Sequence, residues 1–486
     1  MLAWRPVLVA GVVLIAVGNL SPSSNAHQGG DGESVHVHDP LEFTPQGPGA
    51  RLTGGAWRSY GRDLSNSRNA GRKGPTPREA SRLVGAWSFR GTAGGYTGTP
   101  VVARGTVVVG STDGTIHALD AESGALKWSR VVVSRPTAEQ VFATPAVDRG
   151  RVYIPLSRFG RPAIVALRLS DGELLWDTTL DDQPGSDLYG SPVVWRLAES
   201  EGTGQRILYI GVSGGFGEHF DIEPRIRGSL VALDASDGTT LWKRYTVPQG
   251  YDGAPIWTTP AIDPRRGVLY AGTGNAYNPP AWETTDAILS FRARTGRITD
   301  GFQATRDDVY HHHRETSSRD LDFGASPNLF RSPSGRLLVG ALQKSRIYWA
   351  LDARTLERVW SRQTGTTKGR YFQDTLASTA YDGRRIYGQN DDGQVWALTR
   401  AGRRAWVTRA SGESNYSPLA VANGVVYPIR AAGFLDVRRA STGERLARHR
   451  LGAPAWGGVA VAGGWIFAVT GTTGTDAGYV VAYRPA

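Results

Sequence analysis

The sequence predicts an all-β protein, an eight-bladed β-propeller built from four-stranded antiparallel blades. Three observations lead to this fold class. One phrase recurs along the chain, as in "HALDAESGALKW" (117–128), "VALDASDGTTLW" (231–242) and "WALDARTLERVW" (349–360). A second phrase, usually a small or polar residue before proline, opens each unit. Between the two lie β-branched runs with period-2 alternation and Gly- or Asp-bearing turns, the pattern of β-hairpins.

The openings set the number of blades. They occur eight times, near residues 99, 143, 190, 258, 325, 378, 416 and 456. Residues 55–486 thus divide into eight units of about 54 residues, enough for four short strands and their turns. One such sheet leaves its faces uncovered, whereas eight arranged radially cover one another. We expect "GAWSF" (85–89) to share a blade with the C-terminal "GYVVAYRPA" and so close the ring.

Each part of the recurring phrase has an expected role. Its Asp can accept hydrogen bonds from backbone N–H groups in the turn, and its Gly can adopt a positive φ. Its Trp is expected to dock between neighbouring blades, and burial of a side chain of this size contributes a few kcal/mol. The docking residues predicted in this way are Trp128, Trp176, Trp242, Trp360 and Trp406.

The N-terminal region is predicted to lie outside the propeller. Residues 1–26 resemble a secretory signal peptide, with Arg5, an apolar run and small residues at the cleavage positions. The run is shorter than the ~20 residues of a bilayer span, although a retained anchor is the alternative. Residues 27–54 are expected to be a flexible leader. We therefore expect a secreted protein, extracellular or periplasmic, with no membrane span after signal cleavage.

Composition excludes several classes of function. The chain has no Cys, so it forms no disulfide and attaches no c-type haem through cysteine. Its net charge of +11 comes from scattered arginines and not from a basic stripe interleaved with aromatic residues, so we expect no nucleic-acid partner. We find no G-x-S-x-G motif, the turn that carries the nucleophilic Ser of many hydrolases, followed by a suitable His. A hydrolase is therefore not supported.

Three units carry long insertions: "GGFGEHFDIEPRIR" (214–227), "NAYNPPAWETTD" (275–286) and "DDVYHHHRETSSRDLDFG" (307–324). Insertions in a propeller gather in loops at one face, where a site can form. The adjacent histidines at 311–313 do not predict zinc, because neighbouring side chains of an extended segment point apart.

Three stretches carry a specific resemblance: residues 56–71, residues 256–280 with "GTGN", and residues 320–352 with "DLDFG" and "LQKS". They resemble the PQQ-dependent (quinoprotein) alcohol dehydrogenases, most closely the polyvinyl-alcohol-dehydrogenase-like subgroup without haem and cysteines. The resemblance spans residues 56–486. It implies an oxidoreductase that holds pyrroloquinoline quinone (PQQ) and Ca²⁺ on the propeller axis and oxidises a small-molecule or polymeric alcohol.

The resemblance also implies a metal site and a base. The metal ligands would be Glu223, Asn275 and Asp322, and Asp322 would also be the general base, with Lys344 beside the quinone oxygens. Asp320 is an alternative base. If Asp322 is the base, the position where lanthanide-using relatives carry an extra Asp is Gly324, which favours calcium. If Asp320 is the base, Asp322 fills that position.

The remaining implied contacts surround the cofactor. Trp257 would offer the flat face on which the quinone stacks. The other implied cofactor contacts are Lys344, Arg227, Asn390, Tyr189 and Trp456. An external electron acceptor, cytochrome c or a quinone, is implied as partner. The competing hypothesis is a non-catalytic propeller that serves as an extracellular binding or envelope-assembly scaffold, which has no need of Trp257, Asn275, Asp322 and Lys344 together.

Overall fold

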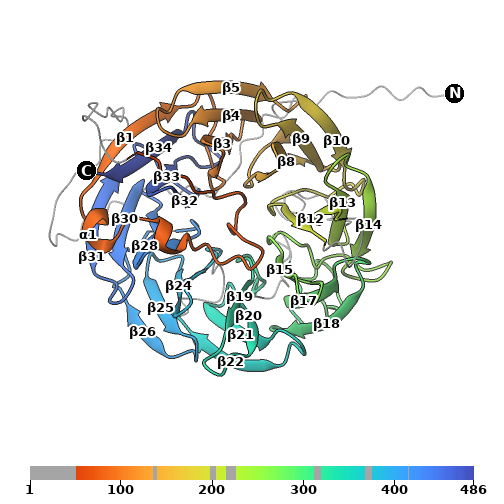
Figure 1. Cartoon of the computed structure of the whole chain (residues 1–486). Helices are drawn as coiled ribbons and strands as arrows, with labels where there is room; N and C mark the ends of the chain where they lie inside the picture. The colour runs from red at the N-terminus through yellow and green to blue at the C-terminus, as the bar shows by residue number, and fades with distance from the viewer. Residues whose placement is uncertain are drawn as a thin grey trace, which may run out of the picture.

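The computed structural model describes residues 51–134, 139–197, 204–214, 226–310, 319–366, 375–413 and 415–486. These residues form eight antiparallel sheets arranged around a central axis (Figure 1). The chain visits the blades in order around the ring, and the predicted eight-bladed propeller is confirmed.

Each blade has four main strands, which follow one another from the axis outward. Blade 1 comprises β2 (Val101–Ala103), β3 (Thr106–Gly110), β4 (Thr115–Asp120) and β5 (Leu126–Val131). Blade 2 comprises β7 (Ala146–Asp148), β8 (Arg151–Arg158), β9 (Ala163–Arg168) and β10 (Leu174–Thr179), with the short β6 (Glu139–Gln140) beside β8. Blade 3 comprises β11 (Val193–Arg196), β12 (Arg206–Val212), β13 (Ser229–Asp234) and β14 (Thr240–Tyr245). Blade 4 comprises β15 (Ala261–Asp263), β16 (Val268–Gly272), β17 (Ala287–Arg292) and β18 (Ile298–Gln303).

The second half of the ring continues the pattern. Blade 5 comprises β19 (Asn328–Arg331), β20 (Leu337–Leu342), β21 (Ile347–Asp352) and β22 (Arg358–Gln363). Blade 6 comprises β23 (Ala380–Tyr381), β24 (Arg385–Gln389), β25 (Val395–Thr399) and β26 (Arg404–Val407). Blade 7 comprises β27 (Ala420–Ala422), β28 (Val425–Tyr427), β30 (Phe434–Arg439), β31 (Arg445–Arg450), with the short β29 (Ile429–Arg430) beside β30. Blade 8 comprises β32 (Val459–Ala462), β33 (Trp465–Val469), β34 (Tyr479–Pro485) and β1 (Leu83–Arg90).

The two ends of the propeller meet in blade 8. The early strand β1 pairs antiparallel with β34, with Trp87 opposite Ala482. In Figure 1 the orange β1 lies against the dark blue β34. The expected sharing of one blade by both ends of the repeat region is therefore confirmed. Two short helices, η1 (Gly71–Lys73) and α1 (Pro77–Ala80), precede β1, and α1 contacts β31.

An outer ring of tryptophans joins successive blades. The indole Nε1 of Trp128 donates to the carbonyl of Leu169 at 2.9 Å, in the last turn of the next blade. A Cβ atom on Gly172 in that turn would lie 2.6 Å from the Trp128 ring, and Gly172 has φ +74°. The glycine of the recurring phrase is therefore required both for its backbone conformation and for the indole above it. The predicted docking role of Trp128 is borne out by these contacts.

An inner ring of hydroxyl groups joins the openings. The backbone N–H of one opening residue donates to the hydroxyl of the opening residue in the next blade. This explains why a Ser or Thr stands at these positions, in front of the proline in every case but Ser378. Five such bonds of 2.7–3.1 Å connect Thr99, Thr144, Ser191, Thr259, Ser326 and Ser378. The polar openings therefore tie six blades together near the axis.

Residues 57–70 form an axial segment that occupies the centre of the ring, where an orange-red trace crosses the middle of Figure 1. Trp57 N–H donates to the Val102 carbonyl at 2.9 Å, and Ser65 and Ser67 accept from Leu329 and Tyr381 at 2.8 Å each. Arg58, Leu64 and Arg68 accept in the same way from strands β7, β15 and β27. The axial segment thus covers the inner edges of six blades, edges that would otherwise present unpaired backbone groups.

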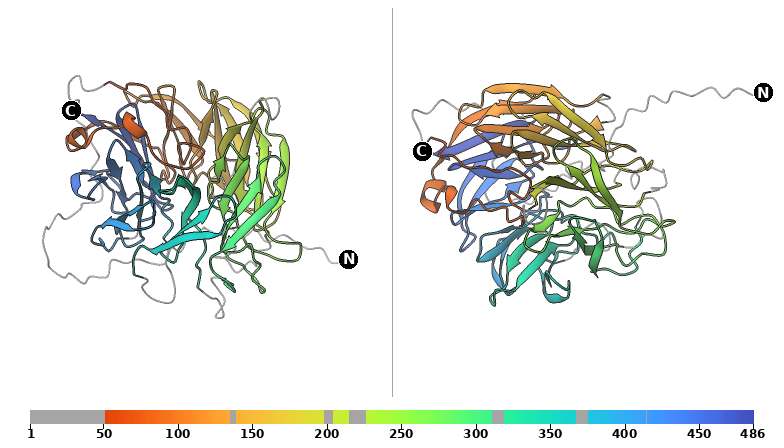
Figure 2. Two further views of the ribbon diagram at one scale, coloured as in Figure 1. Left: turned by 60° about the horizontal axis from the view of Figure 1, so that its bottom comes forward. Right: turned by 45° about the vertical axis from the view of Figure 1, so that its right-hand side comes forward.

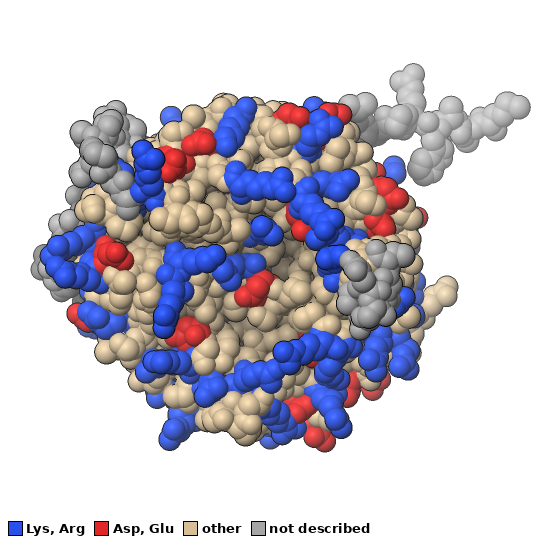
Figure 3. Space-filling view, viewed as in Figure 1, with Lys and Arg blue, Asp and Glu red and all other residues tan. Residues whose placement is uncertain are grey.

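The tilted views in Figure 2 show the blades as a ring of twisted sheets, with α1 at its rim. Figure 3 shows Lys and Arg side chains spread widely over one face, with Asp and Glu between them. Across the described ranges, no helix is both long and apolar enough to span a membrane.

Candidate functional site

The described parts of the insertions of blades 3 to 5 meet at one end of the ring. Gly253 N–H donates to the Ile226 carbonyl at 2.8 Å, Ala254 N–H to the Asn275 carbonyl at 2.9 Å, and Tyr310 N–H to the Ala276 carbonyl at 3.0 Å. Backbone hydrogen bonds therefore join segments from three consecutive blades into one small sheet of loops. Asn275 lies within this sheet of loops.

A charged cluster lies beside this sheet of loops. Lys344 follows β20, and its Nζ lies 2.6 Å from Asp320 Oδ1 and 2.8 Å from Asp322 Oδ1. The same ammonium group lies 5.1 Å from the centre of the Trp257 ring. The structure therefore brings together Trp257, Asp320, Asp322 and Lys344, which come from three stretches of sequence more than 20 residues apart from one another.

Asn275 adjoins the same cluster through its neighbour Gly274. A Cβ atom on Gly274 would lie 3.0 Å from Asp322 Oδ2, so this carboxylate passes close over the Gly274 backbone. Asn275 Nδ2 donates to the carbonyls of Tyr310 at 2.9 Å and Ala276 at 3.1 Å. With the amide nitrogen so engaged, the oxygen Oδ1 is the end of this side chain suited to ligate a cation.

Asp322 and Lys344 are both buried, at 3% and 6% exposure. Burial raises the pKa of the Asp322 carboxyl, and the nearby Lys344 ammonium opposes this rise. Asp286, just before β17, is buried at 0% exposure, and burial raises its pKa well above the ordinary value, an effect strengthened by Asp308 and Asp322. These carboxylates, with Asp320, outnumber Lys344 and make the cluster attractive to a cation.

Asp286 was not predicted from the sequence. Neither of its carboxylate oxygens has a hydrogen-bond partner among the residues the structure describes. Its sequence context, "TTDA" at 284–287, carries no signal of this position, because a single Asp before a strand is also an ordinary turn residue. Only the three-dimensional structure shows that the Asp286 carboxyl group is buried without a hydrogen-bond partner among the described residues.

The third predicted metal ligand, Glu223, lies outside the described residues, as do the histidines at 311–313. Within the described ranges, no three His, Asp or Glu side chains are arranged to hold one metal ion. Asn275, Asp286 and Asp322 all adjoin Gly274: Asn275 follows it in sequence, Asp286 N–H donates to its carbonyl, and Asp322 Oδ2 lies close to it.

The other predicted cofactor contacts lie in separate surroundings. The Arg227 guanidinium stacks 3.6 Å over the Tyr245 ring at the end of β14. Tyr189 donates to Asp187 at 3.2 Å and stacks on Phe142. The Asn390 side-chain oxygen Oδ1 accepts from Thr364 Oγ1, just after β22 of blade 5, and from Trp396 Nε1 in blade 6.

Trp456 is half-buried and makes an edge contact with Tyr416 at 5.5 Å. None of these contacts joins Trp456, Arg227, Tyr189 or Asn390 directly to the Lys344 cluster.

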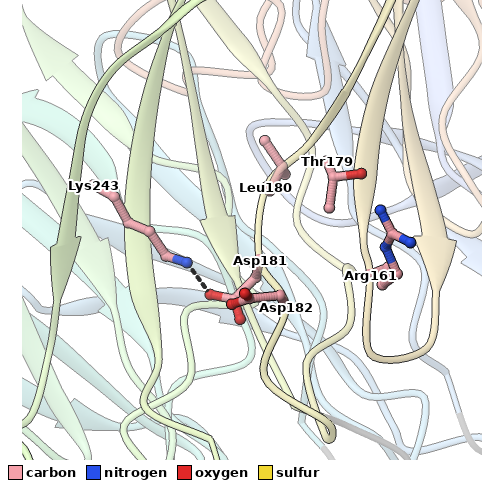
Figure 4. A pocket seen from close by; sticks show the side chains of 6 residues that line it. All are labelled: Arg161, Thr179, Leu180, Asp181, Asp182 and Lys243. Atoms are coloured by element: carbon pink, nitrogen blue, oxygen red, sulfur yellow. Dashed lines mark ion pairs between the residues drawn. The ribbon is translucent and has the colours of Figure 1, made fainter.

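A separate polar cavity of about 560 Å³ lies near the outer strands of blades 2 and 3. In Figure 4 the Lys243 side chain points to Asp181, with which it forms an ion pair, while Arg161 lies apart from this pair. Its lining residues are Arg161, Thr179, Leu180, Asp181, Asp182 and Lys243. It contains none of the predicted site residues.

Comparison with known families agrees with this fold. A family model described as "Outer membrane protein assembly factor BamB" matches residues 85–225 and 332–486, together more than half of the chain. The chain belongs to this family of BamB-type propellers. The match covers repeats on both sides of the segment that carries Trp257, Asn275 and Asp322.

Among curated proteins, this BamB-type propeller is similar to polyvinyl alcohol dehydrogenases. It is 31% identical to that of a Pseudomonas species and 29% identical to that of Sphingopyxis strain 113P3. Each alignment covers 72% of this chain, but only 57% and 58% of the respective relative. The chain therefore spans little more than half the length of these relatives.

Solved structures share the architecture. The quinohemoprotein alcohol dehydrogenase ADHIIG of Pseudomonas putida superposes with a TM-score of 0.73 at 18% identity, over 89% of this chain and 80% of that one. BamB of Moraxella catarrhalis superposes with a TM-score of 0.55 at 14% identity, over 83% of this chain and 99% of that one. At these identities the likeness establishes the fold alone.

Proposed function

We propose that this chain is an alcohol dehydrogenase that uses PQQ as hydride acceptor and Ca²⁺ as Lewis acid. The observation that carries the proposal is the Lys344 ammonium group, bound to Asp320 and Asp322 and lying over the ring of Trp257. A scaffold gains little from a buried charge cluster of this kind, because desolvation makes such clusters costly. The similarity to polyvinyl alcohol dehydrogenases and other quinoprotein dehydrogenases supports the same conclusion.

The residues present fit both proposed groups. Trp257 is half-buried, and no described residue accepts a hydrogen bond from its Nε1, which suits an aromatic wall that faces a ligand. Asn275, Asp322 and Asp286 supply the oxygen donors that Ca²⁺ prefers. When bound, PQQ would accept a hydride at a carbonyl carbon polarised by the metal.

Each residue then has a defined task. Asp322 would take the hydroxyl proton of the alcohol, while the hydride from the alcohol carbon, with its two electrons, would be received by bound PQQ. Lys344 holds Asp322 in place and offsets negative charge that develops on neighbouring oxygens. Asp320 shares the same ammonium group and is the alternative base.

The packing around Gly324 supports calcium rather than a lanthanide when Asp322 is the base. A Cβ atom at Gly324 would lie 2.9 Å from the Trp257 ring and 2.4 Å from Leu376. An extra Asp at this position would therefore displace the aromatic wall. The oxygen donors near Asp322 must come from other residues.

Reconstitution tests the proposal. Purified protein is titrated with PQQ and Ca²⁺, and quinone absorbance and alcohol-dependent dye reduction are measured. We expect Asp322→Asn to bind PQQ yet lose about 10²- to 10⁴-fold in kcat, the usual contribution of a general base. Asp320→Asn is the matched variant. If Asp320→Asn loses turnover and Asp322→Asn keeps it, the base is Asp320.

The alternative function is a non-catalytic envelope-assembly scaffold. The match to the BamB family model and the shared fold of a solved BamB favour it. Absence of any PQQ affinity in the titration, with the protein folded, would support the scaffold and refute the dehydrogenase.

Further features belong to the proposal. Residues 1–26 are a cleaved signal peptide, residues 27–54 a leader, and the protein acts outside the cytoplasm. N-terminal sequencing of the mature protein tests this and should begin at His27. Electrons leave to a separate acceptor, cytochrome c or a quinone, and the substrate is a small or polymeric alcohol.

A further inference from the structure

Asp286 is a buried carboxyl group with no hydrogen-bond partner in the described part of the chain. Its side chain has 0% exposure, and neither oxygen meets a hydrogen-bond donor among the described residues. An unpaired buried carboxylate costs several kcal/mol. Asp436, also buried, is instead paired with Arg438 at 2.8 Å and Arg448 at 2.7 Å.

The backbone places Asp286 next to the candidate site. Asp286 N–H donates to the Gly274 carbonyl at 2.9 Å, and Gly274 both precedes Asn275 and lies beneath the carboxylate of Asp322. The position is fixed from its other side as well, because Ala304 N–H donates to the Asp286 carbonyl at 2.9 Å. Asp286 therefore adjoins two of the predicted metal ligands.

The local cation does not neutralise Asp286. Lys344 Nζ is already bound to Asp320 at 2.6 Å and Asp322 at 2.8 Å. The Asp286 carboxyl group thus has no cationic hydrogen-bond partner among the described residues, at a point surrounded by protein. A hard divalent cation satisfies several carboxylate and amide oxygens at once.

We propose that Asp286 is a further acidic ligand of the divalent-cation site, binding the ion together with Asn275 and Asp322, directly or through one water molecule. The proposal rests on the proposed function, because that function places the ion at this end of the ring. It adds to the site a carboxylate from the insertion of blade 4. The ion in turn explains why an unpaired carboxylate is retained in the core.

Calcium binding by the full chain without PQQ tests the proposal. Protein stripped with a chelator is titrated with Ca²⁺ by calorimetry, and its melting temperature is recorded with and without the ion. We expect Asp286→Asn to weaken Ca²⁺ binding at least tenfold and to raise the melting temperature of the metal-free protein. The increase arises because an amide is less costly to bury than an unpaired carboxylate.

Asp436→Asn is the matched control from blade 7. It should leave Ca²⁺ affinity unchanged and lower the melting temperature, because Arg438 and Arg448 lose their anion. Should Asp286→Asn fail to fold, Asp286→Gly removes the same carboxylate and suits the positive φ of 49° at this position. The same loss of affinity is expected.

The outcomes separate this proposal from the proposed function. If Asp322→Asn weakens Ca²⁺ binding and Asp286→Asn does not, the contribution of Asp286 is refuted while the metal site stands. If the unmodified protein binds no Ca²⁺ with or without PQQ, both are refuted. A tenfold loss with Asp286→Asn, absent in Asp436→Asn, supports the proposal.

Discussion

The two ends of blade 4 contrast in how their polar groups are satisfied. At one end Trp242 donates to the Ala293 carbonyl at 3.0 Å and packs on Gly296, as the repeat requires. At the other end Trp257 Nε1 and both oxygens of Asp286 have no hydrogen-bond partner in the described part of the chain. The indole at the repeat end of blade 4 is therefore hydrogen-bonded, as are those of Trp128 and Trp406, whereas the indoles of Trp176 and Trp360 have no partner among the described residues. The opposite end of blade 4 leaves an indole and a carboxyl group open for a ligand.

The largest expected difference comes from the two tryptophans. Trp242→Ala should lower the free energy of unfolding by about 2–4 kcal/mol, because a packed aromatic side chain is lost. Trp257→Ala should cost less stability but weaken PQQ binding about 10- to 100-fold, because the flat face is lost. Denaturant unfolding and PQQ titration of both variants measure this. If the two variants lose equal stability and bind PQQ equally well, the two tryptophans do not differ in role as expected.

Asp187, in the segment between β10 and β11, is a useful comparison with Asp286, because it is also buried but its carboxylate accepts hydrogen bonds. It accepts from Ser157 Oγ at 2.6 Å and Leu188 N–H at 2.8 Å, and burial still raises its pKa from 3.8 to about 6. Between these values the folded state holds a proton that the unfolded state has lost, so stability falls as pH rises.

The fall attributable to Asp187 is up to about 3 kcal/mol for a shift of this size. Asp187→Asn should remove it, which unfolding curves between pH 4 and pH 6 would show. An unchanged pH dependence in the variant would show that Asp187 titrates normally in the folded protein.

The smallest effect is expected at the repeat end. Gly296→Ala should cost about 1–2 kcal/mol, because alanine is strained at φ +66° and its Cβ would lie 2.4 Å from Trp242. Gly335→Ala is the matched control, with φ +85° and no atom within 4 Å of the added Cβ. The difference between the two measures the contact with Trp242. If both variants lose equal stability, that contact contributes nothing.

The sequence was sufficient to predict the ring, its eight blades, the docking role of Trp128 and the pairing of β1 with β34. These features follow from local patterns that repeat about every 54 residues. The grouping of Trp257, Asp322 and Lys344 was also expected, but through family resemblance and not through pattern.

Other features depend on contacts that a linear pattern does not express. The inner ring of hydroxyl groups was visible only as a preference for Ser or Thr, since the acceptor of each N–H lies about one blade away. Asp286 was missed because isolation is a property of its surroundings. The role of the axial segment was missed because its partners extend from Val102 to Val421.

The axial segment has a consequence for biosynthesis. Trp57 and its neighbours leave the ribosome before any blade, yet Arg68 can meet Val421 only when six blades and the first strand of the seventh have been translated. During translation the strands nearest the centre expose backbone groups that have no permanent partner, a state prone to aggregation. The backbone hydrogen bonds between the axial segment and the inner strands are therefore completed late, although the axial segment is synthesised first.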